Sequence, residues 1–288
     1  MPRLCNSSIV RLADVLSRLY DKYNRFELIK PDPLQFVYKY SNGRDMEIAG
    51  FLAAVLAYGR VAQIEKSVGT LLDKMGKSPF DFVVNFGTKN RKEFGNFRHR
   101  FTSGQDICDL LELLKFALTE YASIEKYFIS GYSKNDETII PPLSVFCKRM
   151  LDKYKKNKRK DASRGLRYLL CDPAQGSACK RLNLFLRWMV RDDDVDAGIW
   201  KSVDKAKLIV PVDVHMARLC RFLGLYESRT VSLPAAIEIT KAFAQIEPSD
   251  PVKYDFALSR IGITEQCTGK YRRQCDDCEL VDFCRKNL

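Results

Sequence analysis

The sequence predicts an all-α protein, because helix-breaking residues are sparse and the apolar residues follow a helical period. Glycine and proline account for 15 and 11 of the 288 residues. Between Phe51 and Val68, apolar residues recur at spacings of three, four and six, as they do on one face of a helix. No run of alternating strands, no repeat and no low-complexity tract interrupts the pattern. Similar helical patterns occupy Ile107–Tyr121, Leu143–Tyr154, Lys180–Arg191, Val214–Leu225 and Leu233–Phe243.

The composition predicts a basic protein with an anionic partner. Hydrophobic residues make up 46% of the chain, which is enough for a substantial core. Lys and Arg number 48 against 36 Asp and Glu, a net charge of +12. Nucleic acid is the commonest partner of such a surface, and an ordinary basic protein is the alternative. Because Met1–Val15 lacks the apolar stretch of a signal peptide and Ile48–Tyr58 is too short to span a bilayer, we expect a cytoplasmic monomer with no membrane partner.

Three polar segments break the helical pattern. Ser130–Pro142 ends in a Pro-Pro pair, which is typical of a loop. Lys153–Arg167 is a dense basic run that fits either a solvated helix end and linker or an edge that contacts phosphates. Asp192–Asp196 is acidic. We interpret it as a solvated turn, since no second carboxylate cluster supports a metal-dependent nuclease.

Four of the ten cysteines lie close together near the C-terminus. Cys267, Cys275, Cys278 and Cys284 follow the spacing C-x7-C-x2-C-x5-C. Four thiolates in so short a segment can close around one centre, and thiolate is the ligand of both iron–sulfur clusters and structural zinc. Zinc sites more often use two separated Cys-x2-Cys pairs. A [4Fe–4S] cluster is therefore the preferred prediction, and zinc or free thiols are the alternatives.

The loop between the first two of these cysteines is basic, with Lys270, Arg272 and Arg273. A bound metal would contribute to folding and hold this loop in a fixed shape, so we predict that the three cations contact DNA phosphates. The remaining cysteines are scattered, and in a reducing compartment they are expected to be small core residues rather than disulfides. They are Cys5, Cys108, Cys147, Cys171, Cys179 and Cys220.

Two residues are candidates for nucleophilic and acid–base chemistry. Lys180 precedes Leu182–Val190, which is apolar around almost its whole circumference and is therefore predicted to be a buried helix. Both the helix N-terminus and burial disfavour a charged amine there, and a neutral lysine is what Schiff-base chemistry needs; a lysine reaching solvent from a helix end is the alternative. Asp213 is predicted to cap the next helix. That position keeps the carboxylate ionised, so a structural and a catalytic role are compatible.

Two further segments are candidates for contact with nucleic acid. Around Gly59, Tyr58 has a ring that can stack on a base, and Arg60 and Gln63 have side chains that can reach the gap left by an extruded nucleotide. A plain turn between two helices is the alternative. Phe97–Phe101 alternates aromatic residues with cations, among them Arg100, and fits either nucleic-acid binding or the edge of the core.

Several motifs resemble those of the helix-hairpin-helix DNA glycosylases. The C-terminal cysteines resemble the cluster loop of the endonuclease III and adenine-mismatch glycosylase families, spaced C-x6-C-x2-C-x5-C, with one residue more between the first two cysteines. Tyr254–Gly262 is similar to the helix that leads into that loop. Val210–Arg218 is similar to the superfamily segment V-D-x-H-x-x-R, with Asp213 at the position of the active-site aspartate.

The resemblance has two departures. The usual L-P-G-x-G hairpin is missing, and Lys180 and Asp213 lie 33 positions apart, farther than in most of the superfamily. This longer separation resembles the archaeal oxoguanine glycosylase branch. Most of the chain, including Arg181–Arg191, Asp196–Trp200 and Asp250–Leu258, resembles a bacterial family of the same superfamily.

The resemblance implies a two-lobed helix-hairpin-helix DNA glycosylase fold with a C-terminal [4Fe–4S] cluster loop at 267–284. One lobe, a helical barrel with the hairpin and Lys180, would span 44–208, and the other would combine 1–43 with 209–288. The implied function is base-excision repair of double-stranded DNA through a Schiff base on Lys180, assisted by Asp213, with AP-lyase activity. A non-catalytic iron–sulfur DNA-binding protein on the same scaffold and a zinc-ribbon-like interaction module are the alternatives.

Overall fold

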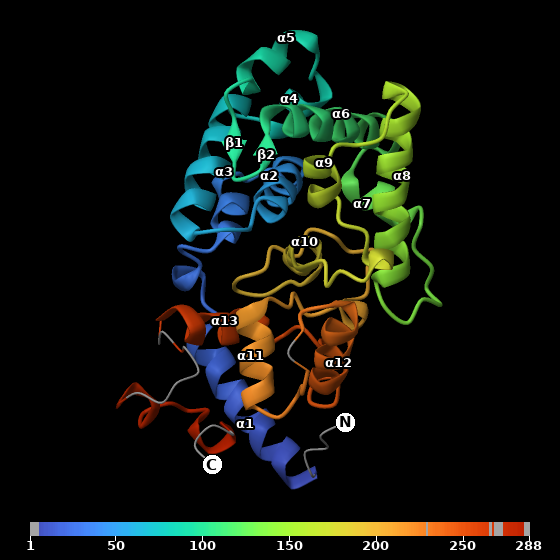
Figure 1. Ribbon diagram of the computed structural model, residues 1–288. Coiled ribbons are helices and arrows are strands. Elements are labelled where there is room, and N and C mark those ends of the chain that lie inside the picture. Colours follow the sequence, from blue (N-terminus) through green and yellow to red (C-terminus); the bar gives the residue numbers. More distant parts are fainter. Residues whose placement is uncertain (1–5, 229, 265–266, 268–272, 285–288) are drawn as a thin grey trace.

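The computed structural model confirms that the protein is mostly helical, with little strand (Figure 1). It describes residues 6–228, 230–264, 267 and 273–284. In Figure 1 the upper part contains α2 (Gly43–Val55), α3 (Val61–Met75), α4 (Pro79–Val84), α5 (Thr88–Arg91), α6 (Gly104–Tyr121), α7 (Ile124–Ile129), α8 (Ile140–Lys158) and α9 (Arg164–Leu169). The lower part contains α1 (Asn6–Tyr23), α11 (Val214–Phe222), α12 (Leu233–Ala244) and α13 (Asp255–Thr264). The division of the chain at residues 44 and 208 stays a prediction.

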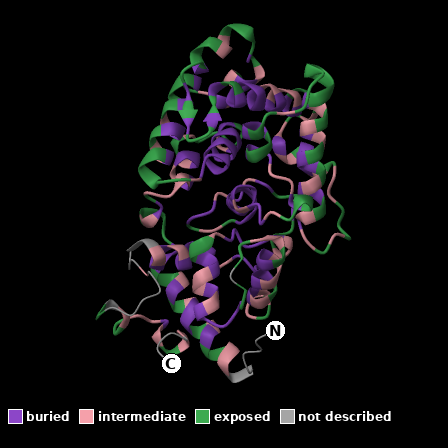
Figure 2. Cartoon of the chain, viewed as in Figure 1, coloured by how far each residue is buried: buried purple, intermediate pink, exposed green. Residues whose placement is uncertain are grey.

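The central helix α10 (Lys180–Val190) lies between these two parts (Figure 1). Every residue from Arg181 to Val190 is buried, as its apolar circumference predicts. The helix packs most extensively against α2, whose residues from Glu47 to Val55 are likewise buried (Figure 2). Lys180, at the first position of α10, is thus carried on a helix that the core holds on all sides.

Two arginines connect this central helix to the lower part of the molecule. Arg187 lies 3.2 Å from Asp196 and also forms an ion pair with Asp255 at the start of α13. Arg191 lies 3.0 Å from Asp250 and also forms an ion pair with Asp196. The side chains in this network are at most 7% exposed. Buried charges are tolerated only when they are paired, so the network fixes α10 against α13.

The acidic run is therefore only partly the solvated turn that we expected. Asp192 and Asp194 are exposed, but Asp196 is fully buried between the two arginines. Asp193 is mostly buried and lies 2.9 Å from Arg191. The sequence pattern did not reveal this, because the arginines that need these carboxylates lie on the preceding helix.

Two helix boundaries differ from the predicted ones. The Pro-Pro pair belongs to the first turn of α8, where a missing backbone donor costs nothing, so the loop ends at Ile139 rather than at Pro142. The helical pattern between Phe51 and Val68 is divided into α2 and α3 by residues 56–60, and Gly59 adopts a φ of 101° there. Only glycine adopts such a conformation without strain.

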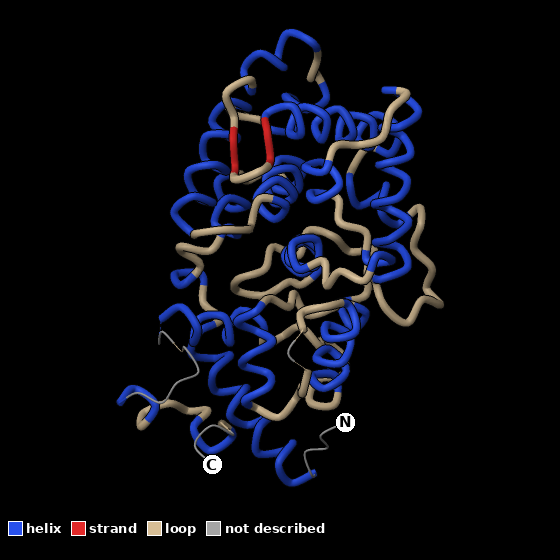
Figure 3. The backbone as a smooth tube through the Cα atoms, in the orientation of Figure 1, coloured by secondary structure: helices blue, strands red, loops and turns tan. Residues whose placement is uncertain are grey.

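A short hairpin lies beside this turn. The strands β1 (Arg98–His99) and β2 (Thr102–Ser103) pair antiparallel and appear as the red segments in Figure 3. The hairpin contacts α3, α6 and α9. Its tip is formed by Arg100, with a φ of 55°, and Phe101. Within the described ranges, no helix has the length and the apolar character that crossing a bilayer requires.

Candidate active site in the cavity between α10 and α11

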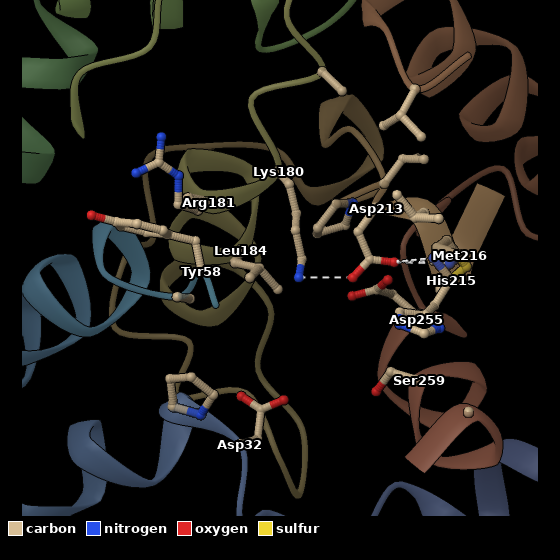
Figure 4. Close-up of a pocket in the computed structure, with 18 of the residues that line it drawn as sticks. Asp32, Tyr58, Lys180, Arg181, Leu184, Asp213, His215, Met216, Asp255 and Ser259 are labelled. Atoms are coloured by element: carbon tan, nitrogen blue, oxygen red, sulfur yellow. Dashed lines mark hydrogen bonds and ion pairs between the residues drawn. The ribbon is translucent and has the colours of Figure 1, made fainter. Parts of the chain in front are cut away.

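A cavity of about 700 Å³ opens where α10, α11 and α13 approach the turn between α2 and α3. Lys180 and Asp213 both line it (Figure 4). The Lys180 Nζ lies 2.8 Å from the Asp213 Oδ2, and the two side chains are 34% and 33% exposed. The fold therefore brings the two predicted catalytic residues, 33 positions apart in the chain, into direct contact at a cavity of ligand-binding size.

Asp213 is the N-cap of α11, as predicted. Its Oδ1 accepts hydrogen bonds from the backbone amides of His215 and Met216, both at 2.9 Å. This leaves Oδ2 for Lys180. Burial alone would raise the pKa of Asp213, but the charge and the hydrogen bond of Lys180 and the Met216 amide outweigh it, and the pKa is lowered. Asp213 is therefore a carboxylate held ionised at the cavity wall.

Asp255 is a third charged residue of the site, and the sequence analysis missed it. It lines the cavity and is buried, and Figure 4 places its carboxylate next to that of Asp213. Burial raises the pKa of Asp255, whereas its ion pair with Arg187 opposes that shift. In the sequence, Asp255 is marked only by its position directly before a helical run. An aspartate at that position is also typical of an ordinary helix start.

An aromatic cluster forms the opposite wall of the cavity. Tyr58 and Tyr168 line the cavity, and the Arg181 guanidinium lies 3.8 Å from the centroid of the Tyr168 ring. The Arg181 Nη1 also donates to the Val55 carbonyl at 2.7 Å. Phe101 stacks on Tyr58 with ring centroids 5.3 Å apart and is 49% exposed. Phe101 thus presents the outermost ring of the cluster.

Three further residues predicted to contact nucleic acid, Arg60, Gln63 and Arg100, lie near the Tyr58 side of this wall. Arg60 is the exposed N-cap residue of α3, and Arg100 is exposed at the hairpin tip. The Arg100 side chain packs over Gly59, where an added Cβ would lie 3.0 Å from its Cδ. Gln63, on the first turn of α3, is also exposed, and its side chain donates to the Ser67 hydroxyl at 3.0 Å.

His99 fixes the hairpin to the turn that carries Tyr58. Its ring is fully buried, with Nε2 2.9 Å from the Tyr58 carbonyl and Nδ1 2.9 Å from the Ser67 hydroxyl. A carbonyl only accepts, so Nε2 carries the proton and Nδ1 accepts from Ser67. Burial lowers the pKa of His99, although the hydrogen bond to Tyr58 opposes that shift.

The four C-terminal cysteines are the donor set of the predicted cluster. All four are partly exposed. Burial raises the pKa of Cys278, and a hydrogen bond from the Leu280 backbone opposes the shift. No three Cys, His, Asp or Glu side chains in the described part of the chain form a metal-ligating group. The donor chemistry fits an iron–sulfur cluster, and the cluster stays a prediction.

The cysteine segment contacts the active-site helix through Arg218 of α11. The Arg218 Nη2 donates to the Cys267 carbonyl at 3.0 Å and lies 2.9 Å from the His215 Nδ1. Arg273 is exposed in the short 3-10 helix Arg273–Cys275. Lys270 and Arg272, the other two predicted phosphate contacts of this loop, lie outside the described residues, as does Cys5.

One protein family matches the chain. The family described as Protein of unknown function (DUF2400) matches residues 32–264, which is most of the sequence. The chain belongs to this family. The DUF2400 region contains Lys180, Asp213 and Asp255 and ends before Cys267, so the pair at the cavity lies within it and the cysteine segment follows it. No curated protein and no solved structure matches the chain.

Proposed function

We propose that the protein is a DNA glycosylase of the helix-hairpin-helix superfamily that excises a damaged base from double-stranded DNA and also acts as an AP lyase. The observation that carries the proposal is the Lys180–Asp213 pair at 2.8 Å on the wall of a cavity. An amine beside a carboxylate is the combination that Schiff-base chemistry requires, because the amine must lose a proton before it attacks carbon.

The chemistry assigns one role to each residue. Asp213 Oδ2 accepts a proton from Lys180, and the neutral amine attacks C1′ of the sugar. The bond between nitrogen and C1′ forms as the bond to the base breaks, and the base leaves with the electron pair and takes up the proton that Asp213 had accepted, so Asp213 is ionised again. Asp213 then offsets the positive charge on the sugar. The Schiff base on Lys180 permits cleavage of the strand.

The walls of the cavity suit an extruded nucleotide. C1′ cannot be attacked inside an intact stack, so the nucleotide has to leave the duplex, and a cavity of about 700 Å³ is large enough to receive a base. Tyr58 and Tyr168 offer aromatic surface to it. Outside the cavity, the exposed ring of Phe101 and the cation of Arg100 face the region where the duplex would lie.

The cysteine segment has a supporting role in this proposal. Cys267, Cys275, Cys278 and Cys284 would hold a [4Fe–4S] cluster, which contributes binding free energy that orders the loop rather than a reaction step. The hydrogen bond from Arg218 to the Cys267 carbonyl connects that loop to the helix capped by Asp213. The loop cations then contact phosphates on one side of the extruded nucleotide.

The test is borohydride trapping on duplex DNA that contains an abasic site. The wild-type protein should give a covalent complex, and Lys180→Gln should abolish it, because the substitution removes the amine and keeps most of the side-chain volume. Lys201→Gln is a matched control, since Lys201 forms an ion pair of similar length with Asp192, at 2.7 Å, but both side chains are about 70% exposed. It should trap like the wild type.

Two results contradict the proposal in different ways. If Lys180→Gln still traps DNA, another amine is the nucleophile. If the wild-type protein binds damaged duplexes but never traps them, the protein binds DNA without Schiff-base chemistry.

A further inference from the structure

Three thiols that we expected to be scattered core residues gather beside Lys180. The carbonyl of Cys171 accepts hydrogen bonds from the thiols of Cys147, at 3.5 Å, and Cys179, at 3.0 Å. Cys147 is fully buried on α8. Cys171 and Cys179 line the cavity together with Ser177, and Cys171 is the partly exposed member of the three.

The three thiols differ in reactivity, because only the pKa of Cys171 is lowered. The neighbouring Cys179 side chain is the largest cause of that shift; burial opposes it, and Ser177 and the charge of Arg181 add to it. The pKa of Cys147 is raised by burial. A thiolate is the nucleophilic form of cysteine, so Cys171 is the reactive member.

We propose that Cys171 and Cys179 are a redox-active pair in the cavity wall, which a peroxide converts to a disulfide that displaces Lys180 from Asp213. The Cys171 thiolate attacks a peroxide oxygen, so an S–O bond forms, the O–O bond breaks, and the departing hydroxide takes up a proton to give water. Cys179 then attacks the sulfenic acid, so the S–S bond forms and a second water leaves with the proton of Cys179. Two thiols are oxidised and one peroxide is reduced.

The pair is connected to Lys180 through the backbone. Cys179 is the N-cap residue of α10 and adopts a left-handed conformation, with φ 45° and ψ 38°. Few residues other than glycine adopt that conformation without strain. A disulfide requires the sulfurs to approach to about 2.05 Å and removes the hydrogen bond from the Cys179 thiol to the Cys171 carbonyl. Because Lys180 directly follows Cys179, a shift of the Cys179 backbone on closure of the disulfide moves Lys180 as well.

The sequence provides a direct assay for this oxidation. Trypsin cleaves after Arg167 and Lys180, and the peptide from Tyr168 to Lys180 contains no cysteine other than Cys171 and Cys179. After treatment of the whole protein with hydrogen peroxide and alkylation of free thiols, this peptide should be two hydrogen atoms lighter and unalkylated. Dithiothreitol should restore both alkylation sites. Cys171→Ser and Cys179→Ser should each prevent the change.

Cys108 provides the comparison within the same protein. It is buried on α6, its thiol donates to the Arg91 carbonyl at 3.8 Å, and burial raises its pKa. Cys108 should stay alkylatable after unfolding at peroxide concentrations on the order of tenfold above those that oxidise the pair. The proposal is overturned if Cys171 and Cys179 remain free under these conditions, or if either sulfur joins a cysteine of the C-terminal segment instead.

The consequence at Lys180 rests on the proposed function, but the disulfide does not. Oxidised protein should lose borohydride trapping and regain it on reduction, whereas Cys171→Ser should trap equally with and without peroxide. If the disulfide forms and trapping by the wild type is unchanged, the coupling to Lys180 is wrong. If the disulfide forms and no sample traps DNA at all, the pair stands and the glycosylase proposal fails.

Discussion

Asp213 divides its two carboxylate oxygens between the backbone and the cavity. Oδ1 accepts from the amides of His215 and Met216, and Oδ2 contacts Lys180. Oδ1 therefore caps the helix and Oδ2 serves the chemistry, and substitutions of Asp213 can separate these two roles. Asparagine keeps an oxygen for the amides but has no charge, whereas alanine keeps neither.

We predict that Asp213→Asn lowers the rate of borohydride trapping by about two to four orders of magnitude but leaves the helix cap intact. Asp213→Ala should lower the rate as much and also reduce the free energy of unfolding by about 1 kcal/mol, because the cap is lost. Urea unfolding followed by the fluorescence of Trp188 and Trp200, both buried, measures the stability. Equal stability losses for the two variants would contradict the cap.

The same residue should make stability depend on pH. The pKa of Asp213 is lowered in the fold, so its ion pair stabilises the protein fully above the pKa of an unfolded aspartate, about 4. That contribution is lost as the pH falls from there through the lower pKa of the folded state. Asp213→Asn should remove this part of the acid dependence.

At the scale of elements, the β1–β2 hairpin is held by one buried imidazole. His99 is neutral in the fold, because its Nδ1 accepts from Ser67 while its Nε2 donates to Tyr58. Protonation would turn Nδ1 into a donor as well, and Nδ1 could then no longer accept the hydrogen bond from Ser67. The position of Phe101 and of the cavity wall thus depends on the neutral form of a histidine two residues away.

We predict that the protein loses stability as the pH falls below about 6.5. Because the pKa of His99 is lowered in the fold, the unfolded chain takes up a proton first, and the stabilisation decreases until the pH reaches the folded pKa. His99→Gln should be less stable at pH 7 and should lose this dependence. Urea unfolding between pH 5 and 7 (roughly the range in which histidine titrates) is the measurement.

The second histidine is the control for this titration. The chain has two histidines, and His215 is exposed on α11. His215→Gln should leave the pH dependence of stability in place. If instead it removes that dependence and His99→Gln does not, the hairpin is not the element that titrates.

At the scale of the whole molecule, the sequence predicted the elements better than their contacts. The helical period identified α6, α8, α10, α11 and α12, because a buried helix has to repeat its apolar face. The Lys180–Asp213 pair was expected from a resemblance, and no periodicity relates two residues 33 positions apart. Asp255, Asp196 and Cys171 took their roles from partners on other helices, and a single sequence does not show which helices meet.

The positive charge is a property of the whole molecule, and it predicts how DNA binding depends on salt. The net charge is +12, and three exposed arginines lie next to residues that line the cavity: Arg60 between Gly59 and Val61, Arg100 against Gly59, and Arg167 before Tyr168. If duplex DNA binds over these arginines, each phosphate contact releases a counterion. Affinity should then fall about a hundredfold or more between low and physiological salt.

Single substitutions show which residues contribute phosphate contacts to this salt dependence. Arg100→Ala should weaken binding to undamaged and damaged duplexes alike and reduce the slope of log affinity against log salt by about 1. Lys89→Ala is the control, because Lys89 is exposed on α5 at the far end of the upper part (Figure 1); its slope should equal that of the wild type. If Lys89→Ala changes the slope and Arg100→Ala does not, DNA binds away from the cavity. Lys180 would then be too far from any nucleotide to act on it.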